Sequence, residues 1–191
     1  MMSAAITALS VHGAYVLTTP ILSDTRGDFL VTFNQADLAS LRLTTHVEQI
    51  NLVANPRRGT LRGLHYQIAP YEEVKTIRVV QGTIYDVLVD VRPSSPTRGQ
   101  WCAVTLTSGI GQTLYLPAGV AHGYLTLTDD AQVCYTTSCA YMPRHAKGIR
   151  WKVPGSPGGR GGLEYLGENV EDYKRRYSMK TDDGEKGWKD L

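Results

Sequence analysis

Short β-rich segments recur along the chain at intervals of about ten residues, and this repetition restricts the fold more than any other feature. The clearest segments cover residues 83–91, 101–106, 112–116, 123–127 and 131–136. Each is rich in β-branched or aromatic residues, and glycine, proline or other turn residues lie between them. Strands of this length and spacing form sandwiches or barrels. The sequence therefore predicts an all-β domain.

Helical signals are few. Residues 34–41 are the best candidate, with Asn34 as the N-cap, and residues 168–177 are a second. The chain has 191 residues, which suits one domain with a tail. We expect a folded domain over residues 1–151. Residues 152–191 then form a Gly-rich connector and a charged tail that packs on or near the functional site.

Composition excludes several classes of protein. The 20 basic and 18 acidic residues give a net charge of +2, which is too small to indicate a nucleic-acid partner. No apolar run approaches the roughly 18 residues of a membrane helix, and the N-terminus lacks the features of a signal peptide. Cys102, Cys134 and Cys139 form no CxxC pair, so we expect neither a disulfide framework nor a zinc cluster. These features predict a cytoplasmic protein without a membrane or nucleic-acid partner.

Two histidines lie in turn-rich, strand-like surroundings, His65 within residues 63–67 and His122 within residues 117–123. His122 completes the spacing Gly111-x5-Pro117-x-Gly119-x2-His122, which resembles the second signature of the cupin jelly roll. In that signature the glycine and proline form a turn, and the histidine points into the mouth of the barrel. We therefore expect an all-β cupin jelly-roll barrel with a few short helices.

The histidine pattern argues against a metal site. Metal cupins commonly use a His-x-His pair, and the matching positions here are His65 and Gln67. Glutamine is a poor ligand for transition metals, which generally need three or more protein ligands. We therefore expect no metal and no other cofactor, with the barrel used for acid–base chemistry. The alternative is a metal site that Glu72 or Glu73 completes.

Cationic residues gather around the first histidine. Arg57, Arg58, Arg62, Lys75 and Arg78 fall within 22 residues. Arginine can bind diphosphate oxygens through two parallel hydrogen bonds. On a regular strand Arg62 and His65 would point to opposite faces, unless a bulge intervenes. A histidine among these cations predicts an anionic substrate from which a proton is moved.

A longer series of motifs resembles the dTDP-4-dehydrorhamnose 3,5-epimerase family. The matching stretches are residues 24–29, 58–67, 79–101, 116–124, 135–137 and 149–151. They occur in the family's order, from about residue 13 to about residue 151. The resemblance implies a cupin jelly roll that acts as a homodimer. It also implies an isomerase whose substrate is a nucleotide diphosphate 4-keto-6-deoxy sugar, epimerised at carbon 3, carbon 5 or both.

The resemblance also implies roles for individual residues. His65 matches the base that removes a proton next to the ketone, and Tyr135 matches the acid on the opposite face of the sugar. Lys75 matches the cation beside the ketone oxygen, and His122 matches a substrate contact that we expect Asp86 to orient. Further matches to substrate or nucleotide contacts are Arg26, Gln49, Asn51 and Arg62. A neutral imidazole and a protonated phenol are both available near pH 7.

The chain departs from the family pattern where the family contacts its ligand. Val31 stands where a glutamate is usual, Asp28 where an aromatic residue is usual, and Ala146 where a second acidic residue is usual. A family Tyr-Tyr pair becomes Ala140-Tyr141. These departures leave open a different sugar, a different nucleotide or a single inverted centre.

The partner of the proposed base is a carboxylate in a Ser-x-Lys-Asp motif of the family. The nearest match is residues 178–182, with one extra residue, so Asp182 is the predicted catalytic partner of His65. Asp172 and Asp183 are the alternatives. Because the tail is altered, a non-catalytic cupin that only binds a nucleotide sugar remains an alternative, beside the metal-dependent cupin enzyme.

Overall fold

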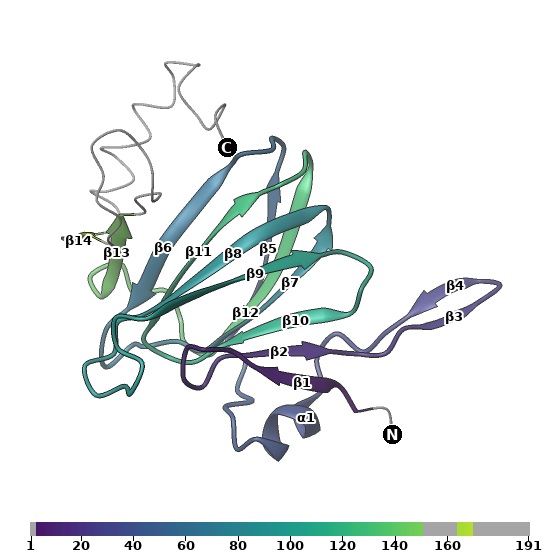
Figure 1. Cartoon of the computed structure of the whole chain (residues 1–191), viewed down its shortest axis with the longest axis horizontal. Helices are drawn as coiled ribbons and strands as arrows, with labels where there is room; N and C mark the ends of the chain where they lie inside the picture. The colour runs from purple at the N-terminus through teal and green to yellow at the C-terminus, as the bar shows by residue number, and fades with distance from the viewer. Residues whose placement is uncertain (1–2, 151–163, 170–191) are drawn as a thin grey trace.

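The computed structural model describes residues 3–150 and 164–169, and two six-stranded antiparallel sheets make up most of this part of the chain (Figure 1). The first sheet has the order β1 (Ala5–Ala8), β2 (Tyr15–Thr18), β10 (Gln112–Leu116), β7 (Lys75–Gln81), β12 (Ala131–Thr137) and β5 (Gln49–Asn55). The second has the order β14 (Glu164–Asn169), β13 (Ala146–Arg150), β6 (Leu61–Gln67), β11 (Val120–Thr126), β8 (Thr83–Asp90) and β9 (Trp101–Thr107).

The strand order shows why segments far apart in sequence meet. From β5 to β8 and again from β9 to β12, successive strands pass between the two sheets, so that each sheet pairs strands that are not neighbours along the chain. This is the connectivity expected of a jelly roll. The all-β cupin-type prediction is confirmed, with the difference that the strands form two separate sheets and not one closed barrel.

The main core lies between the two sheets. Alternate residues of β7 and β8, such as Ile77 and Leu88, are 1% and 0% exposed and belong to one apolar cluster. Because strand side chains alternate between faces, residues in register with these define the inner face of each sheet. A smaller cluster around Leu64 and Val87 lies on the outer face of the second sheet.

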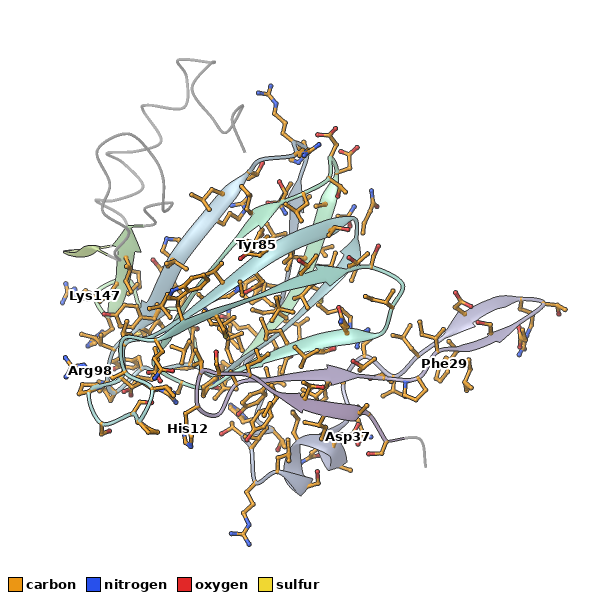
Figure 2. The ribbon with its side chains drawn as sticks, viewed as in Figure 1. His12, Phe29, Asp37, Tyr85, Arg98 and Lys147 are labelled. Carbon is orange, nitrogen blue, oxygen red and sulfur yellow. The ribbon has the colours of Figure 1, made fainter. Side chains whose placement is uncertain are left out.

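The helix prediction is confirmed for residues 34–41. Helix α1 spans Gln35–Ser40, and the Asn34 side chain accepts a hydrogen bond from the backbone N–H of Ala36 at 3.0 Å. Leu38 packs on the outer face of the first sheet, and buried Asp37 is labelled beside it in Figure 2. Within the described ranges no helix is long and apolar enough to cross a membrane.

The C-terminal predictions fall largely outside the described residues. Strand β14 pairs with β13 and extends the second sheet, so part of the predicted connector and tail belongs to a sheet. The predicted helix at 168–177 is wrong at its start, because Glu168 and Asn169 end β14, and its remaining residues lie outside the described range.

A small hairpin of β3 (Leu22–Asp24) and β4 (Gly27–Phe29) projects away from both sheets (Figure 1).

Candidate active site

An irregularity in strand β6 brings its arginine and its histidine to the same face. His65 lies opposite His122 of β11, but Arg62 lies opposite Tyr124, so three steps on β6 match two steps on β11. Directly opposed residues of an antiparallel pair point to the same side of the sheet. The bulge therefore allows the side chains of Arg62 and His65 to point to the same face of the sheet. That face is the inner one, since Tyr124 belongs to the main core.

A buried carboxylate holds the second histidine. The Nε2 atom of His122 lies 2.8 Å from Oδ2 of Asp86 on β8, and the two side chains are 12% and 0% exposed. Burial raises the pKa of Asp86, although His122 and the nearby Lys75 ammonium oppose this shift. The expected contact between Asp86 and His122 is therefore present. It fixes the orientation of the imidazole at the inner face of the second sheet.

The first sheet presents the remaining candidate residues from the other side. Tyr135 of β12 lies opposite the core residue Ile77 of β7 and opposite Asn51 of β5. Two residues further on, Thr137 lies opposite both Lys75 and Gln49. The side chains of Tyr135, Lys75, Asn51 and Gln49 therefore share the inner face of the first sheet. Gln49 is exposed, which places it at the rim.

A hydrogen bond and through-space electrostatic interactions link the two inner faces. Burial raises the pKa of Tyr135, the Glu73 carboxylate raises it further, and the Arg62 guanidinium lowers it. Arg62 belongs to the second sheet, and a 2.7 Å hydrogen bond from its Nε to Oδ1 of Asn55, the last residue of β5, links it to the first sheet. Tyr135 is consequently a protonated phenol at neutral pH, close to a fixed cation.

Three polar residues of this region were not identified as part of the acid–base site by sequence reasoning. Asn55 anchors Arg62, Tyr124 donates to the same Asn55 oxygen at 3.5 Å, and Glu73 forms a 2.8 Å ion pair with Lys75. Glu73 lies two residues before Lys75, and this spacing could have revealed it. No comparable spacing links Asn55 to Tyr124, because 69 residues separate them.

The candidate metal ligands do not form a site. Gln67 Nε2 donates to the carbonyl oxygens of Tyr71 and Ala140, and its Oε1 accepts from the Met142 N–H. The Gln67 amide thus braces two loops, and Glu72 is exposed. Among the residues described here, no group of three or more His, Cys, Asp or Glu side chains could hold a metal ion. In the described part of the chain, therefore, nothing supports the alternative of a metal site that Glu72 or Glu73 completes.

The structure does not bring every predicted residue to this region. Arg26 lies at the turn of the β3–β4 hairpin, where it pairs with Asp24 at 2.6 Å and is 88% exposed. The hairpin points away from the sheets of its own chain (Figure 1). The three candidate partners of His65, namely Asp172, Asp182 and Asp183, lie outside the described residues.

The departures from the family pattern occupy two places. Asp28 and Val31 are exposed and lie on or just after the projecting hairpin. Ala146 is 3% exposed and lies opposite Gln67, at the pairing of β13 with β6. Tyr141, of the Ala140-Tyr141 pair, is 46% exposed in the loop before β13. These substitutions therefore leave His65, Lys75 and Tyr135 in place.

The fold and this arrangement define a class of protein: a cupin-type jelly roll that carries a histidine and a phenol on facing sheets, each with a cation on the same face. Such a site can move protons at a carbon acid. The family model for dTDP-4-dehydrorhamnose 3,5-epimerase matches residues 8–156, and this chain belongs to that family. It is an isomerase that epimerises nucleotide-linked 4-keto-6-deoxy sugars, as the sequence predicts.

Individual relatives agree with the family model. The dTDP-4-dehydrorhamnose 3,5-epimerase of Shigella flexneri is 39% identical over 133 residues, which are 69% of this chain and 72% of the relative. The crystal structure of the Bacillus anthracis dTDP-4-dehydrorhamnose 3,5-epimerase, with TDP and PPi bound, is 33% identical, with a TM-score of 0.76 over 82% of this chain and 93% of that one. A 3'-monoepimerase from Streptomyces bikiniensis in complex with dTDP-quinovose is 30% identical, with a TM-score of 0.72 over 94% and 91%.

Proposed function

We propose that this protein epimerises carbon 3, carbon 5 or both of a dTDP-linked 4-keto-6-deoxy sugar, with His65 as the base and Tyr135 as the acid. One observation carries the assignment: the two residues occupy the inner faces of opposite sheets, His65 on β6 and Tyr135 on β12. A sugar ring between the sheets would meet the base on one face and the acid on the other. Removal and return of a proton on opposite faces inverts the centre.

The proposed reaction balances without a cofactor. His65 takes the proton from the carbon next to the carbon 4 ketone, and the electron pair moves onto the ketone oxygen to give an enolate. Lys75 supplies a fixed positive charge near that oxygen. Tyr135 then gives its proton to the opposite face of the carbon, as the enolate collapses to the ketone. Solvent exchange returns a proton to Tyr135 and removes one from His65, whose proposed partner is Asp182.

The remaining polar residues suit the substrate. Arg62 lies at the inner face of the second sheet, where a guanidinium can bind diphosphate oxygens. Gln49 and Asn51 share the face of Tyr135, and His122 lies beside His65. We propose that these four residues contact the sugar and the nucleotide.

Deuterium incorporation tests the proposal. Purified protein is incubated with dTDP-4-keto-6-deoxyglucose in heavy water and followed by proton NMR, beside the folded variant His65→Ala. Deuterium at carbon 3 or carbon 5, lost in the variant, supports the epimerase and its base. A variant that exchanges at the wild-type rate contradicts the role of His65. Wild-type protein that binds the sugar tightly without exchange would support the non-catalytic cupin.

The same experiment decides how many centres are inverted. The chain is similar both to 3,5-epimerases and to the Streptomyces bikiniensis 3'-monoepimerase, and it departs from the family pattern at Asp28, Val31 and Ala146. Deuterium at both carbons indicates a double epimerase, whereas deuterium at one carbon indicates a single-centre enzyme.

We further propose that the protein acts as a homodimer. Part of the outer face of the first sheet is apolar and uncovered, with Ile50 70%, Leu52 64% and Val80 47% exposed. Phe29 is 62% exposed on the projecting hairpin (Figure 2). A second copy would cover this face, and the hairpin could then carry Arg26 to the partner's site.

Light scattering after size exclusion tests the homodimer. We expect a dimer for the wild type and a monomer for Ile50→Glu combined with Leu52→Glu. Arg26→Ala should remain dimeric while its KM rises about tenfold, the effect of one lost charged contact. A monomeric wild type contradicts the proposal.

We also propose a cytoplasmic location. Cys102, Cys134 and Cys139 are free thiols, as suits a reducing compartment. Fractionation of the producing cells tests this, and recovery of the protein outside the cytoplasmic fraction would contradict it.

A further inference from the structure

Glu73 and Lys75 form an ion pair at the edge of the acid–base site. Lys75 begins β7, and Glu73 lies two residues earlier, so both side chains point to the same side of the extended chain. The Nζ atom of Lys75 lies 2.8 Å from Oε1 of Glu73, and the two side chains are only 15% and 10% exposed. A charge this well buried is costly without a partner, so the pair stays together in the folded protein.

The carboxylate of Glu73 is also held from its other side. Its Oε2 atom accepts a 3.4 Å hydrogen bond from Nε2 of Gln67. Gln67 is itself fixed by the backbone of Tyr71, Ala140 and Met142. The β6 strand, two loops and the ion pair therefore act together to hold the Lys75 ammonium group.

Glu73 also acts on the phenol of Tyr135. Around this phenol lie Glu73 before β7, Arg62 of β6 and Tyr124 of β11. After burial, the negative charge of Glu73 is the main influence that raises the pKa of Tyr135, while Arg62 lowers it. Lys75 acts on the second buried carboxylate, Asp86, whose pKa it lowers. Glu73 thus offsets one of two cations at the inner faces of the sheets.

We propose that Glu73 is a positioning residue of the epimerase site, which fixes the Lys75 ammonium group at the inner face of the first sheet and offsets its charge beside Tyr135. The inference rests on the proposed roles of Lys75 and Tyr135. A cation that is already fixed stabilises a developing enolate better than one that must first be ordered. A phenol kept protonated is ready to return the proton. Glu73 itself need not touch the substrate.

A charge-removing variant with a matched control tests the rate effect. Glu73→Gln keeps the size of the side chain and removes its charge, and Glu72→Gln makes the same change at the exposed neighbour. We expect kcat for deuterium exchange to fall about tenfold in Glu73→Gln, with KM changed less than about threefold, because positioning affects the chemical step. Glu73→Asp should recover most of the rate. Equal kcat values for Glu73→Gln and Glu72→Gln would overturn the proposal.

A substrate-free measurement separates this proposal from the proposed function. Tyrosine labelled with carbon-13 at Cζ is titrated by NMR, and the Tyr135 signal is identified by its loss in Tyr135→Phe. The midpoint of Tyr135 should move to lower pH in Glu73→Gln and stay unchanged in Glu72→Gln. The electrostatic role is overturned if the phenol titrates at the same pH in both glutamine variants, or if it shows no titration in either variant. This result stands even if the wild type exchanges no proton of any nucleotide sugar.

A double variant covers the case in which Glu73→Gln does not fold. Glu73→Gln combined with Lys75→Gln leaves no unpaired charge, and circular dichroism checks its fold. Because the rate effect of Glu73 depends on the Lys75 ammonium group that it positions, the double variant should exchange about as fast as Lys75→Gln alone. A further tenfold loss beyond Lys75→Gln would mean that Glu73 acts independently, and would overturn the proposal.

Discussion

Two aspartates on the same strand show how differently a buried carboxylate can be used. Asp86 and Asp90 both lie on β8, four residues apart, and the side chains of both are 0% exposed. Residues at this spacing point to the same face of a strand. Both side chains are shielded from solvent, but Asp86 lies much deeper in the protein than Asp90, and their polar neighbours differ as well.

Asp90 is surrounded by donors. Arg92 binds it through Nε at 2.9 Å and Nη2 at 2.7 Å, and the hydroxyls of Ser95 and Thr97 bind it as well. Burial opposes the ionisation of Asp90, but these hydrogen bonds outweigh it and hold the pKa well below its usual range. Asp90 thus fixes the loop that follows β8.

Asp86 has fewer donors. Its Oδ2 atom meets His122, and its Oδ1 atom accepts no hydrogen bond from the described residues. Here burial outweighs the attraction of His122 and Lys75, so the pKa of Asp86 is raised. A carboxylate kept at such a cost beside a histidine is typical of a functional site. The comparison teaches that depth of burial and the number of donors together set the direction in which the pKa of a solvent-shielded carboxylate moves.

The largest effect should come from Tyr135, the proposed acid. Tyr135→Phe keeps the ring and removes the proton that is returned, so we expect exchange to fall about 1000-fold, equivalent to about 4 kcal/mol of barrier. Deuterium incorporation measures this effect. Tyr85 lies on the outer face of β8, the strand of Asp86 and Asp90, and Tyr85→Phe is the control (Figure 2). Its exchange rate should stay within about twofold of the wild type. Equal losses of exchange in the two variants would contradict the proposed role of Tyr135 as the acid.

Asp90→Asn should lower stability and leave the chemistry unchanged. The substitution leaves Arg92 without its buried partner, so we expect the free energy of unfolding to fall by about 3 kcal/mol. Denaturant unfolding measures the loss, and kcat measured where the variant is still folded should match the wild type. A variant as stable as the wild type would show that the hydrogen bonds to Asp90 contribute little.

Asp86→Asn should have the opposite effect. Removal of a carboxylate with a raised pKa relieves its desolvation, so the melting temperature should stay equal or rise. His122 loses its charged partner, and we expect kcat to fall about tenfold, or about 1.4 kcal/mol, through poorer positioning of the substrate. Thermal unfolding and deuterium exchange are measured on the same preparation. A clear loss of stability with unchanged kcat would reverse the comparison.

The smallest effect is a difference in pH dependence. The folded-state pKa of Asp86 is raised, so above about pH 4 the unfolded chain releases this proton more readily than the folded protein. The wild type should therefore lose stability relative to Asp86→Asn as the pH rises above about 4. For Asp90, whose pKa is lowered, the advantage over Asp90→Asn should hold above about pH 4 and decline below it. Denaturant titrations across pH measure both slopes, and slopes of the same sign would contradict the assignment.

Sequence reasoning reached most of the fold and part of the site. The strands at 83–91 and 131–136 and the helix capped by Asn34 appear where local residue preferences place them. These elements are readable because strand formers, turn residues and caps act over a few positions. The start of β14 within the expected tail was not readable, because strand 164–169 depends on pairing with β13.

The candidate site shows the same distinction between what local sequence predicts and what strand pairing decides. Motifs predicted His65 and Tyr135 because each lies in a recognisable stretch, Lys75 was predicted from its position between two such stretches, and the spacing to Pro117 and Gly119 predicted His122. Whether Arg62 and His65 share a face depended on a bulge, which only the pairing of β6 with β11 decides. Arg26 shows the reverse case: its motif is clear, yet its hairpin places it away from the site of its own chain.

By itself, the sequence determined the class of fold, the family and the residue types available for proton transfer, because these depend on local preferences and on motifs that are continuous along the chain. Only the tertiary structure decided which charges meet. The pairs Asp86–His122 and Arg62–Asn55 join different strands, and the opposite pKa shifts of Asp86 and Asp90 arise from the depth of burial and the donors that folding gives to each. Electrostatic interactions act through space, so their strength depends on distances and burial that the order of residues does not specify.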